Sequence, residues 1–360
     1  MPSNVKELLK WEGLTALYTE ADYNLQTPLT DKFFTNPIQV DGDEYEILVD
    51  PNDTRPAPIN RKDSAARNMD GVGLIDRRGV LLRTFNSQSF GQDVMSAIRE
   101  PKSRELDRKG KAEILRQTAR FRQRHALLKE LLIARALTTG SVIYDRSTGN
   151  IVDTASGTTE TIDLGVAAAH KGNLGGQVSV TLANVAFDLI GLLDYIDSTA
   201  IVENSEPITD VHCDISMKAL IYKNTQFQAW AAKGNRDSES VLRGQFVEGL
   251  FGKNWHFYGA SYTDSTGTKK KYIPSTVMAF TPPAESRTWY DPAEGSSLVP
   301  TSVEAKGSIE DAVNSLAEVY GPHSYSQATL NPVRVDHYAG DCFGWNYKAP
   351  QSVFMPTVVF

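Results

Sequence analysis

The clearest hydrophobic pattern in the chain predicts one long amphipathic helix in its first half. Apolar side chains recur at helical spacing within residues 111–137, and the stripe comprises Ile114, Phe121, Leu127, Leu128, Leu131, Leu132 and Ala134. The pattern can begin as early as Arg104, and it ends before Gly140, which suits the position after a helix C-terminus. Such a helix is about 40 Å long, so we expect a rigid scaffold element.

The residues before this helix show a weaker pattern. One short amphipathic helix is predicted from Leu8, Leu9, Trp11, Leu14 and Leu17. The chain then becomes polar and extended, and Pro28 and Pro37 interrupt it. We therefore expect residues 1–37 to form an arm rather than a domain.

A long polar segment lies between two predicted strands, 45–49 and 79–83. In residues 50–71 the apolar side chains are few, namely Ala57, Ile59, Ala65, Ala66 and Met69. Such a segment cannot bury a core of its own, and ordering it costs on the order of 20–40 kcal/mol at about 1–2 kcal/mol per residue. Composition leaves two interpretations open: a disordered loop, or a two-stranded arm that becomes ordered on another subunit.

From Ser141 onward, helices and strands alternate without the rhythm of a parallel βαβ fold. A hairpin is predicted from the strands 142–144 and 150–152, with a turn at 145–149. The other predicted elements are helices at 182–196 and 308–320 and strands at 255–258, 275–280 and 333–338. This order of elements predicts an α+β fold.

Charge is distributed unevenly along the chain. The 360 residues carry a formal net charge of −7, which argues against a dedicated reader of duplex DNA. Between Arg99 and Arg124, however, ten Lys or Arg residues stand against four Asp or Glu. This basic stretch is either a solvated helix face or a surface for a polyanion, which it would bind weakly, non-specifically and with strong salt dependence.

Two cysteines, Cys213 and Cys342, cannot form a disulfide framework and match no zinc spacing, so we expect folding in a reducing cytosol. The N-terminus lacks the apolar core of a signal peptide. The most apolar stretch, 180–196, is interrupted by polar residues and is not expected to span a membrane.

A search for catalytic and metal-binding motifs gives no positive result. The sequence has no H-E-x-x-H, no G-x-S-x-G and no EF-hand loop, and the segment 244–249 lacks the Lys-Ser/Thr of a phosphate loop. His212 and Cys213 are adjacent on a predicted strand and would point to opposite faces, so they would not share a metal with His337 and Cys342. We predict no catalytic residue, metal or cofactor. An enzyme with an unrecognised site in residues 166–330 remains the alternative.

Four stretches resemble the lambda-like phage major capsid protein E family. Residues 122–140 are similar to the family's helix end, which finishes A-L-x-T-G, and residues 162–165 (I-D-L-G) are similar to its short I-D-F-G strand. Residues 255–282 follow its pattern Y-x-G-x-Y-x-D-x-x-G, then F-x-P, V and P, with a compressed spacing around Tyr258. Residues 351–360 resemble its ending, Q-S … P … P-x-A-V-V.

The resemblance implies an α+β fold of the Hong Kong 97-like phage major capsid type. The implied parts are an N-terminal arm at 1–37, an E-loop at 38–91, a P-domain at 92–165 with a spine helix at 104–138 and a hairpin, an A-domain at 166–330, and a P-domain closing strand with the C-terminal tail at 331–360.

The implied function is that of a major capsid (head) protein of a tailed bacteriophage. Copies would assemble in the host bacterial cytoplasm into hexamers and pentamers of an icosahedral shell, the virion capsid, around double-stranded DNA. The implied partners are the protein itself, a scaffold protein, a portal, a decoration protein where one exists, and packaged DNA contacted non-specifically. An encapsulin-like compartment shell of the same fold is the alternative.

The resemblance also implies roles for individual residues. Arg116, Arg120 and Arg124 would face the lumen and its DNA. Intersubunit contacts of the E-loop would come from Arg55, Arg61, Lys62 and Arg67, and the N-terminal arm would clasp a neighbour through Trp11, Leu14 and Leu17.

Overall fold

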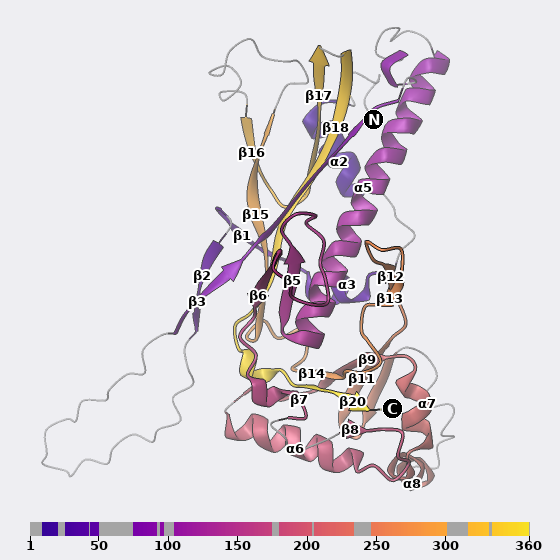
Figure 1. Cartoon of the computed structure of the whole chain (residues 1–360), viewed down its shortest axis with the longest axis vertical. Helices are drawn as coiled ribbons and strands as arrows, with labels where there is room; N and C mark the ends of the chain where they lie inside the picture. Colours follow the sequence, from indigo (N-terminus) through magenta and orange to yellow (C-terminus); the bar gives the residue numbers. More distant parts are fainter. Residues whose placement is uncertain are drawn as a thin grey trace, which may run out of the picture. The chain divides into compact units, whose positions relative to one another are not determined.

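The computed structural model describes most of the chain, which is drawn in Figure 1. The described residues are 9–20, 26–42, 44–49, 75–91, 94–96, 104–174, 180–203, 205–233, 246–300, 316–330 and 333–359. They form two compact units, both built from separate stretches of chain. Unit 1 comprises Met1–Tyr45, Val80–Ile133 and Pro292–Trp345, and unit 2 comprises Glu46–Gly79, Ala134–Asp291 and Asn346–Phe360.

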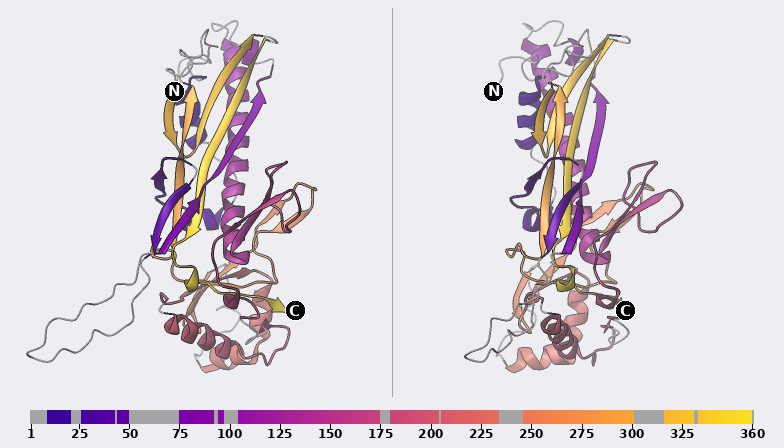
Figure 2. Two further views of the ribbon diagram at one scale, coloured as in Figure 1. Left: turned by 60° about the vertical axis from the view of Figure 1, so that its left-hand side comes forward. Right: turned by 90° about the vertical axis from the view of Figure 1, so that its left-hand side faces the viewer.

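The main sheet of unit 1 has six strands, and its long strands run side by side in both views of Figure 2. They are β1 (Ile38–Val40), β4 (Leu82–Ser89), β15 (Tyr290–Pro300), β16 (Leu316–Tyr320), β17 (His323–Leu330) and β18 (Val333–Tyr347). Strand β1 joins β15 in parallel, whereas β17 and β4 both pair with β18 in antiparallel fashion. Strand β18 is therefore the centre of the sheet.

Three helices contribute to unit 1: α2 (Trp11–Glu20), α3 (Pro28–Phe33) and most of α5 (Arg104–Thr139). The predicted long helix is confirmed as α5, which has 36 residues. Its apolar stripe covers one face of the sheet, because Phe121 meets the ring of His337 on β18 edge-on with centroids 5.1 Å apart. Burial of Ile114 and Phe121 thus fixes which side of α5 remains exposed.

Unit 2 is built around a four-stranded sheet, in the order β10 (Phe246–Leu250), β11 (Lys253–Tyr258), β9 (Asp210–Asp214) and β14 (Ala279–Thr281). Strands β9 and β11 are parallel, and the other two pairings are antiparallel. The apolar core includes Trp255 and Phe257 of β11 and Leu193 and Ile196 of α6 (Leu189–Val202). Helices α7 (Met217–Lys223) and α8 (Thr225–Lys233) contribute to the same core.

Five two-stranded ribbons complete the described strands. Three of them are β2 (Glu44–Val49) with β3 (Ile75–Val80), β5 (Ser141–Asp145) with β6 (Thr159–Asp163), and β12 (Ser261–Thr263) with β13 (Lys269–Lys271). Near the C-terminus, β19 (Met355–Pro356) and β20 (Val358–Val359) pair in parallel with β7 (Lys171–Gly172) and β8 (Val180–Thr181). This pairing holds the chain end within unit 2.

The structure corrects two predictions in the second half of the chain. Residues 316–320, predicted as the end of a helix, form β16, since they pair in register with 296–300 of β15; residues 301–315 lie outside the described part. The hairpin strand β5 pairs mainly with β6 at 159–163, whereas the predicted partner 150–152 contributes only a bridge between Tyr144 and Ile151. The loop is therefore longer than predicted.

Two helix starts also differ from the pattern. The stretch after the first helix is not extended throughout, because Pro28 opens α3, where its fixed φ suits a first helical turn. Helix α6 begins at Leu189 rather than near Leu182, because the Asp188 side chain caps it by accepting a hydrogen bond from the Gly191 amide.

Some residues lie in a different unit from their predicted neighbours. Strand β4, within the range assigned to the E-loop, pairs with β18 in unit 1, so the sheet begins near Val80. Strands β16 and β17 also belong to unit 1, although the resemblance placed residues 166–330 in one domain.

Candidate functional site

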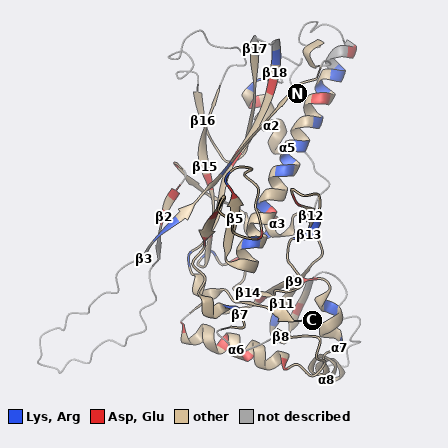
Figure 3. Ribbon diagram, viewed as in Figure 1, with Lys and Arg blue, Asp and Glu red and all other residues tan. Residues whose placement is uncertain are grey.

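Helix α5 carries a row of Lys and Arg residues, whose positions are blue along the ribbon in Figure 3. Arg116, Arg120 and Arg124 are all exposed and follow one another at intervals of four residues. Side chains at this spacing lie on the same side of a helix. Arg108 and Lys109 extend the exposed cationic surface toward the helix N-terminus.

The three arginines differ in how much of their charge is compensated. The guanidinium of Arg116 donates two hydrogen bonds to the Glu113 carboxylate, at 3.0 and 2.8 Å. These hydrogen bonds are the main reason that the pKa of Glu113 is lowered. Among the described residues, Arg120 and Arg124 have no salt bridge or side-chain hydrogen bond. The uncompensated positive charge of the row is therefore concentrated at Arg120 and Arg124.

This surface has the properties of a weak polyanion contact. Its cations stand on one rigid helix whose other face is packed in the core, so their spacing is fixed. Arginines in a row can neutralise phosphates without reading bases, and such contacts depend strongly on salt.

The predicted clasp residues of the N-terminal arm contact their own unit. Leu14 is 0% exposed in a cluster that includes Phe90, Ile114 and Val335, and Leu17 packs against the same cluster. Trp11 is half-buried. In this structure Leu14 has no surface left for a neighbouring subunit. The E-loop candidates Arg55, Arg61, Lys62 and Arg67 lie outside the described residues.

Polar contacts also hold helix α2 against the rest of unit 1. The Thr15 hydroxyl donates to the Ser324 carbonyl at 3.0 Å and accepts from the Ser324 amide at 3.1 Å. The Tyr18 hydroxyl is hydrogen-bonded to Nδ1 of His125, and Arg122 donates to the Tyr18 carbonyl. Burial lowers the pKa of His125 to about 4, so this histidine is neutral at pH 7.

Glu130 on α5 makes a helix-capping contact that the sequence pattern did not reveal. Its carboxylate is 0% exposed and accepts hydrogen bonds from the amides of Leu29 and Thr30, at 3.0 and 2.7 Å, and from the Thr30 hydroxyl at 2.7 Å. The acid therefore caps the N-terminus of α3. The only available signal was a glutamate beside the apolar stripe.

A cavity of about 240 Å³ lies between α2, α3, α5 and the sheet of unit 1. Its charged groups compensate one another: the Lys129 ammonium lies 2.9 Å from the carboxylate of Asp341 and 3.7 Å from that of Glu294. Lys129 also lies over the rings of Phe34 and Phe343. The charged side chains that line the cavity balance one another. The lining therefore has no net charge that would select a ligand.

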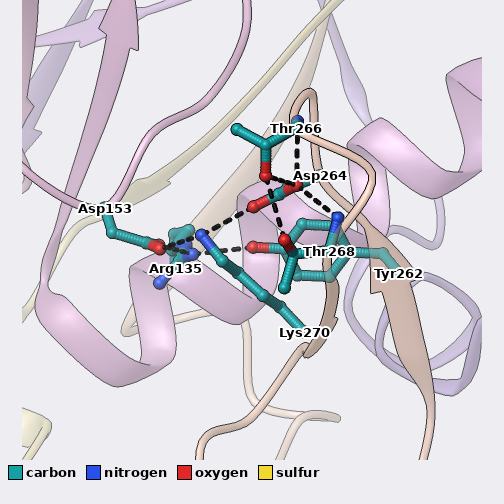
Figure 4. Close-up of polar contacts among 7 residues, drawn as sticks. All are labelled: Arg135, Asp153, Tyr262, Asp264, Thr266, Thr268 and Lys270. Atoms are coloured by element: carbon teal, nitrogen blue, oxygen red, sulfur yellow. Dashed lines mark hydrogen bonds and ion pairs between the residues drawn. The ribbon is translucent and has the colours of Figure 1, made fainter.

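The motif residues of the β12–β13 hairpin form a turn held by one carboxylate, shown in Figure 4. Oδ1 of Asp264 accepts hydrogen bonds from the amides of Thr266 and Thr268, both at 2.9 Å, and from the Thr266 hydroxyl at 2.6 Å. The hydrogen bond from Lys270, with those from Thr266, holds the pKa of Asp264 well below its usual range. The D-x-x-G part of the motif is therefore a structural turn.

The same network connects this hairpin to the end of α5 (Figure 4). The Lys270 ammonium lies 2.9 Å from Asp264 and 2.7 Å from Asp153. Arg135 of α5 forms a salt bridge with Asp153 and donates to the Tyr262 hydroxyl at 2.9 Å. Since these charges pair with one another, the cluster fixes the hairpin and offers no group for chemistry.

Two glycines account for part of the motifs at residues 122–140 and 162–165. Gly140 has φ +65°, and a Cβ there would lie 2.8 Å from the Lys171 side chain. Gly165 has φ +79° and donates to the Asp163 carboxylate at 3.0 Å, with Arg77 close above it. Both positions need a left-handed backbone, which glycine adopts without strain.

The histidines and cysteines do not assemble a metal site among the residues that the structure describes. His212 and His256 stack on neighbouring strands, with ring centroids 4.8 Å apart, and His256 lies 3.3 Å from Asp210. Cys213 is buried in the core of unit 2. Within the same described ranges, no helix is long and apolar enough to cross a membrane.

Comparison with known proteins gives one family and several structures. The model of the family "phage major capsid protein E" matches residues 11–299. A structure described as a capsid protein of a prophage from E. coli CFT073 is similar with a TM-score of 0.53 and 13% identity, covering 98% of this chain and 99% of that chain.

A phage-related protein from Bordetella bronchiseptica RB50 is similar with a TM-score of 0.52 and 10% identity, covering 97% and 96% of the two chains. At these identities the similarity concerns the fold. A search of curated protein sequences gives no match.

Proposed function

Because the chain belongs to the phage major capsid protein E family, we propose that its copies assemble as hexamers and pentamers into an icosahedral head around double-stranded DNA. The family match over residues 11–299 carries this proposal. The α+β fold of the Hong Kong 97-like capsid type agrees with it. The family consists of structural shell proteins, so the chain acts through self-association.

The geometry of α5 supports a contact between the shell and packaged DNA. Arg120 and Arg124 offer uncompensated charge on a rigid helix, and Arg116 adds a partly compensated one. The chain as a whole is acidic, which suits a shell that must not hold DNA tightly. We assign this face to the lumen.

The remaining partners follow from the capsid function. We expect assembly in the host bacterial cytoplasm with a scaffold protein and a portal, and a decoration protein where one exists. The E-loop residues Arg55, Arg61, Lys62 and Arg67 are proposed to contact neighbouring subunits. The family match favours this phage function over an encapsulin-like compartment.

Sedimentation velocity of the purified protein tests the proposal. A capsid protein should shift from small species to capsomers or closed shells as concentration rises or when its scaffold is added. A protein that remained monomeric under all these conditions would contradict the proposal and favour an enzyme with its site in residues 166–330.

A further inference from the structure

Strand β4 has a backbone edge that no other described strand covers. Among the described strands it pairs only with β18, in a continuous register of eight residue pairs. The Phe90 amide donates to the Val335 carbonyl at 2.9 Å, which continues that register. Hydrogen-bonded pairs alternate in an antiparallel ladder. The backbone groups of Phe85, Ser87 and Ser89 therefore point away from β18.

The usual protections of an edge strand are absent from β4. Edge strands are commonly short, interrupted by a bulge or Pro, or carry Lys. Strand β4 has eight residues, L-R-T-F-N-S-Q-S, with no Pro or Lys, and its ladder with β18 has no bulge. Its single charge, Arg83, donates to the Ser296 carbonyl at 3.2 Å. Residues 84–89 thus present an uncharged edge.

An aromatic platform lies beside this edge. Phe85 is 55% exposed and stacks on Tyr338 of β18, with centroids 5.4 Å apart and planes at 13°. Tyr338 stacks in turn on Tyr325 of β17, at 5.1 Å and 17°. The three rings cross three strands on the face of the sheet opposite to His337, whose ring packs against α5. Of the three rings only Phe85 is exposed, since Tyr338 is half-buried and Tyr325 is buried beneath the stack. An exposed ring supported in this way is typical of a protein contact.

We propose that the β4 edge and the platform of Phe85, Tyr338 and Tyr325 dock a second copy of this chain, which adds an extended strand to β4 and covers Phe85. The inference rests on the proposed function, because a self-associating capsid chain supplies the partner. Residues 84–89 carry no charge, so this part of the edge does not attract a polyanion, and a strand that pairs with it does not bury a charge of β4. Strand addition uses the open backbone groups, and the platform supplies apolar contact.

Two substitutions with matched controls test this surface. Ser87→Pro removes an outward-facing amide without removing a hydrogen bond to β18, as edge strands tolerate, whereas Ser87→Ala keeps the amide. Phe85→Ser removes the apolar contact, and Phe85→Tyr keeps it. The measurement is the lowest protein concentration at which assemblies form, by sedimentation. Thermal unfolding followed by circular dichroism checks that each subunit is folded.

We expect Ser87→Pro and Phe85→Ser to raise that concentration by roughly tenfold or more, and both controls to behave like the wild type. If the wild type assembles and both Ser87→Pro and Phe85→Ser assemble at the same concentration, this inference is overturned and the capsid function stays intact. Absence of wild-type assembly overturns the capsid function and the inference together. If Ser87→Pro does not fold, Phe85→Ser alone decides.

Discussion

At the scale of single residues, the basic face of α5 is less uniform than its sequence suggests. Four-residue spacing puts Arg116, Arg120 and Arg124 on one side of α5, and all three are exposed, whereas their predicted direction toward the lumen stays a prediction. The sequence pattern could not show that Glu113 holds Arg116 in a bidentate contact, which depends on the rotamers of both side chains. Arg120 and Arg124 therefore offer the charge that a polyanion would meet.

Replacing Arg120 and Arg124 by Gln should weaken binding to a short DNA duplex and flatten its salt dependence. Loss of two phosphate contacts reduces the slope of log affinity against log salt by about 1.8. Arg116→Gln should have a smaller effect, and Glu113→Gln should increase affinity by releasing Arg116. A titration at several salt concentrations measures these three variants. Arg146→Gln, in unit 2, is the control, and an equal effect of this control would refute the assignment.

Acid should destabilise unit 1 through its buried histidines. Burial lowers the pKa of His125 and of His337 to about 4, below the unfolded value of about 6.5. The folded state then binds fewer protons at these two sites, so their contribution to stability is constant above about pH 6.5 and is lost between pH 6.5 and 4. At pH 5 each histidine costs about 2 kcal/mol.

Urea unfolding at pH 7.5 and pH 5 measures this loss. Burial raises the pKa of Glu294, so this carboxyl group adds to the stability of the folded state on acidification. The effect of one histidine is therefore measured by comparing a variant with the wild type. His337→Asn should show a smaller loss on acidification than the wild type. The same loss in both proteins would show that His337 does not cause it.

At the scale of secondary-structure elements, long periodic segments were predictable and short ones were not. The apolar stripe of α5 predicted its position because apolar residues recur at helical spacing from Ile114 to Ala134. The strand β16 was mistaken for a helix end, since five residues such as L-A-E-V-Y fit either period and only pairing with β15 decides. Helix α3 depends on Glu130, which is a hundred residues away in sequence.

Glu130→Gln should destabilise the docking of α3. The buried carboxylate accepts three hydrogen bonds, and an amide can accept only with one oxygen, so we expect a loss of about 1–3 kcal/mol in the free energy of unfolding. Denaturant unfolding measures the loss. Glu105→Gln, on the exposed part of α5, is the control. Equal stability of the Glu130 variant and wild type would exclude the capping role.

Asp264→Asn should loosen the β12–β13 hairpin without unfolding unit 2. The carboxylate holds the turn amides of Thr266 and Thr268, and Lys270 connects it to Asp153. Hydrogen exchange in residues 261–271 should therefore become faster, while exchange in β9 and β11 stays unchanged. Unaltered exchange in the hairpin would show that the turn does not need the charge. Asp145→Asn, in a separate turn, serves as the control.

At the scale of the whole molecule, the sequence predicted the family and the fold class, but not how the two units divide the chain. Four motifs in the right order sufficed for the family, and two of them contain residues with a clear structural role: Gly140 follows the end of α5, and Asp264 holds a turn. The unit boundaries depend on long-range pairing, as in β4 with β18, which no local pattern encodes. The same pairing created the open β4 edge.

Electron cryomicroscopy of particles formed by this chain tests the central claim most directly. We predict closed icosahedral shells in which the density of every subunit fits the two units, with the face of Arg120 and Arg124 directed to the lumen and another subunit lying along β4. Filaments, sheets or isolated subunits under conditions where the protein is folded would contradict the claim. A shell with the arginine face directed outward would retain the capsid function and refute the DNA contact.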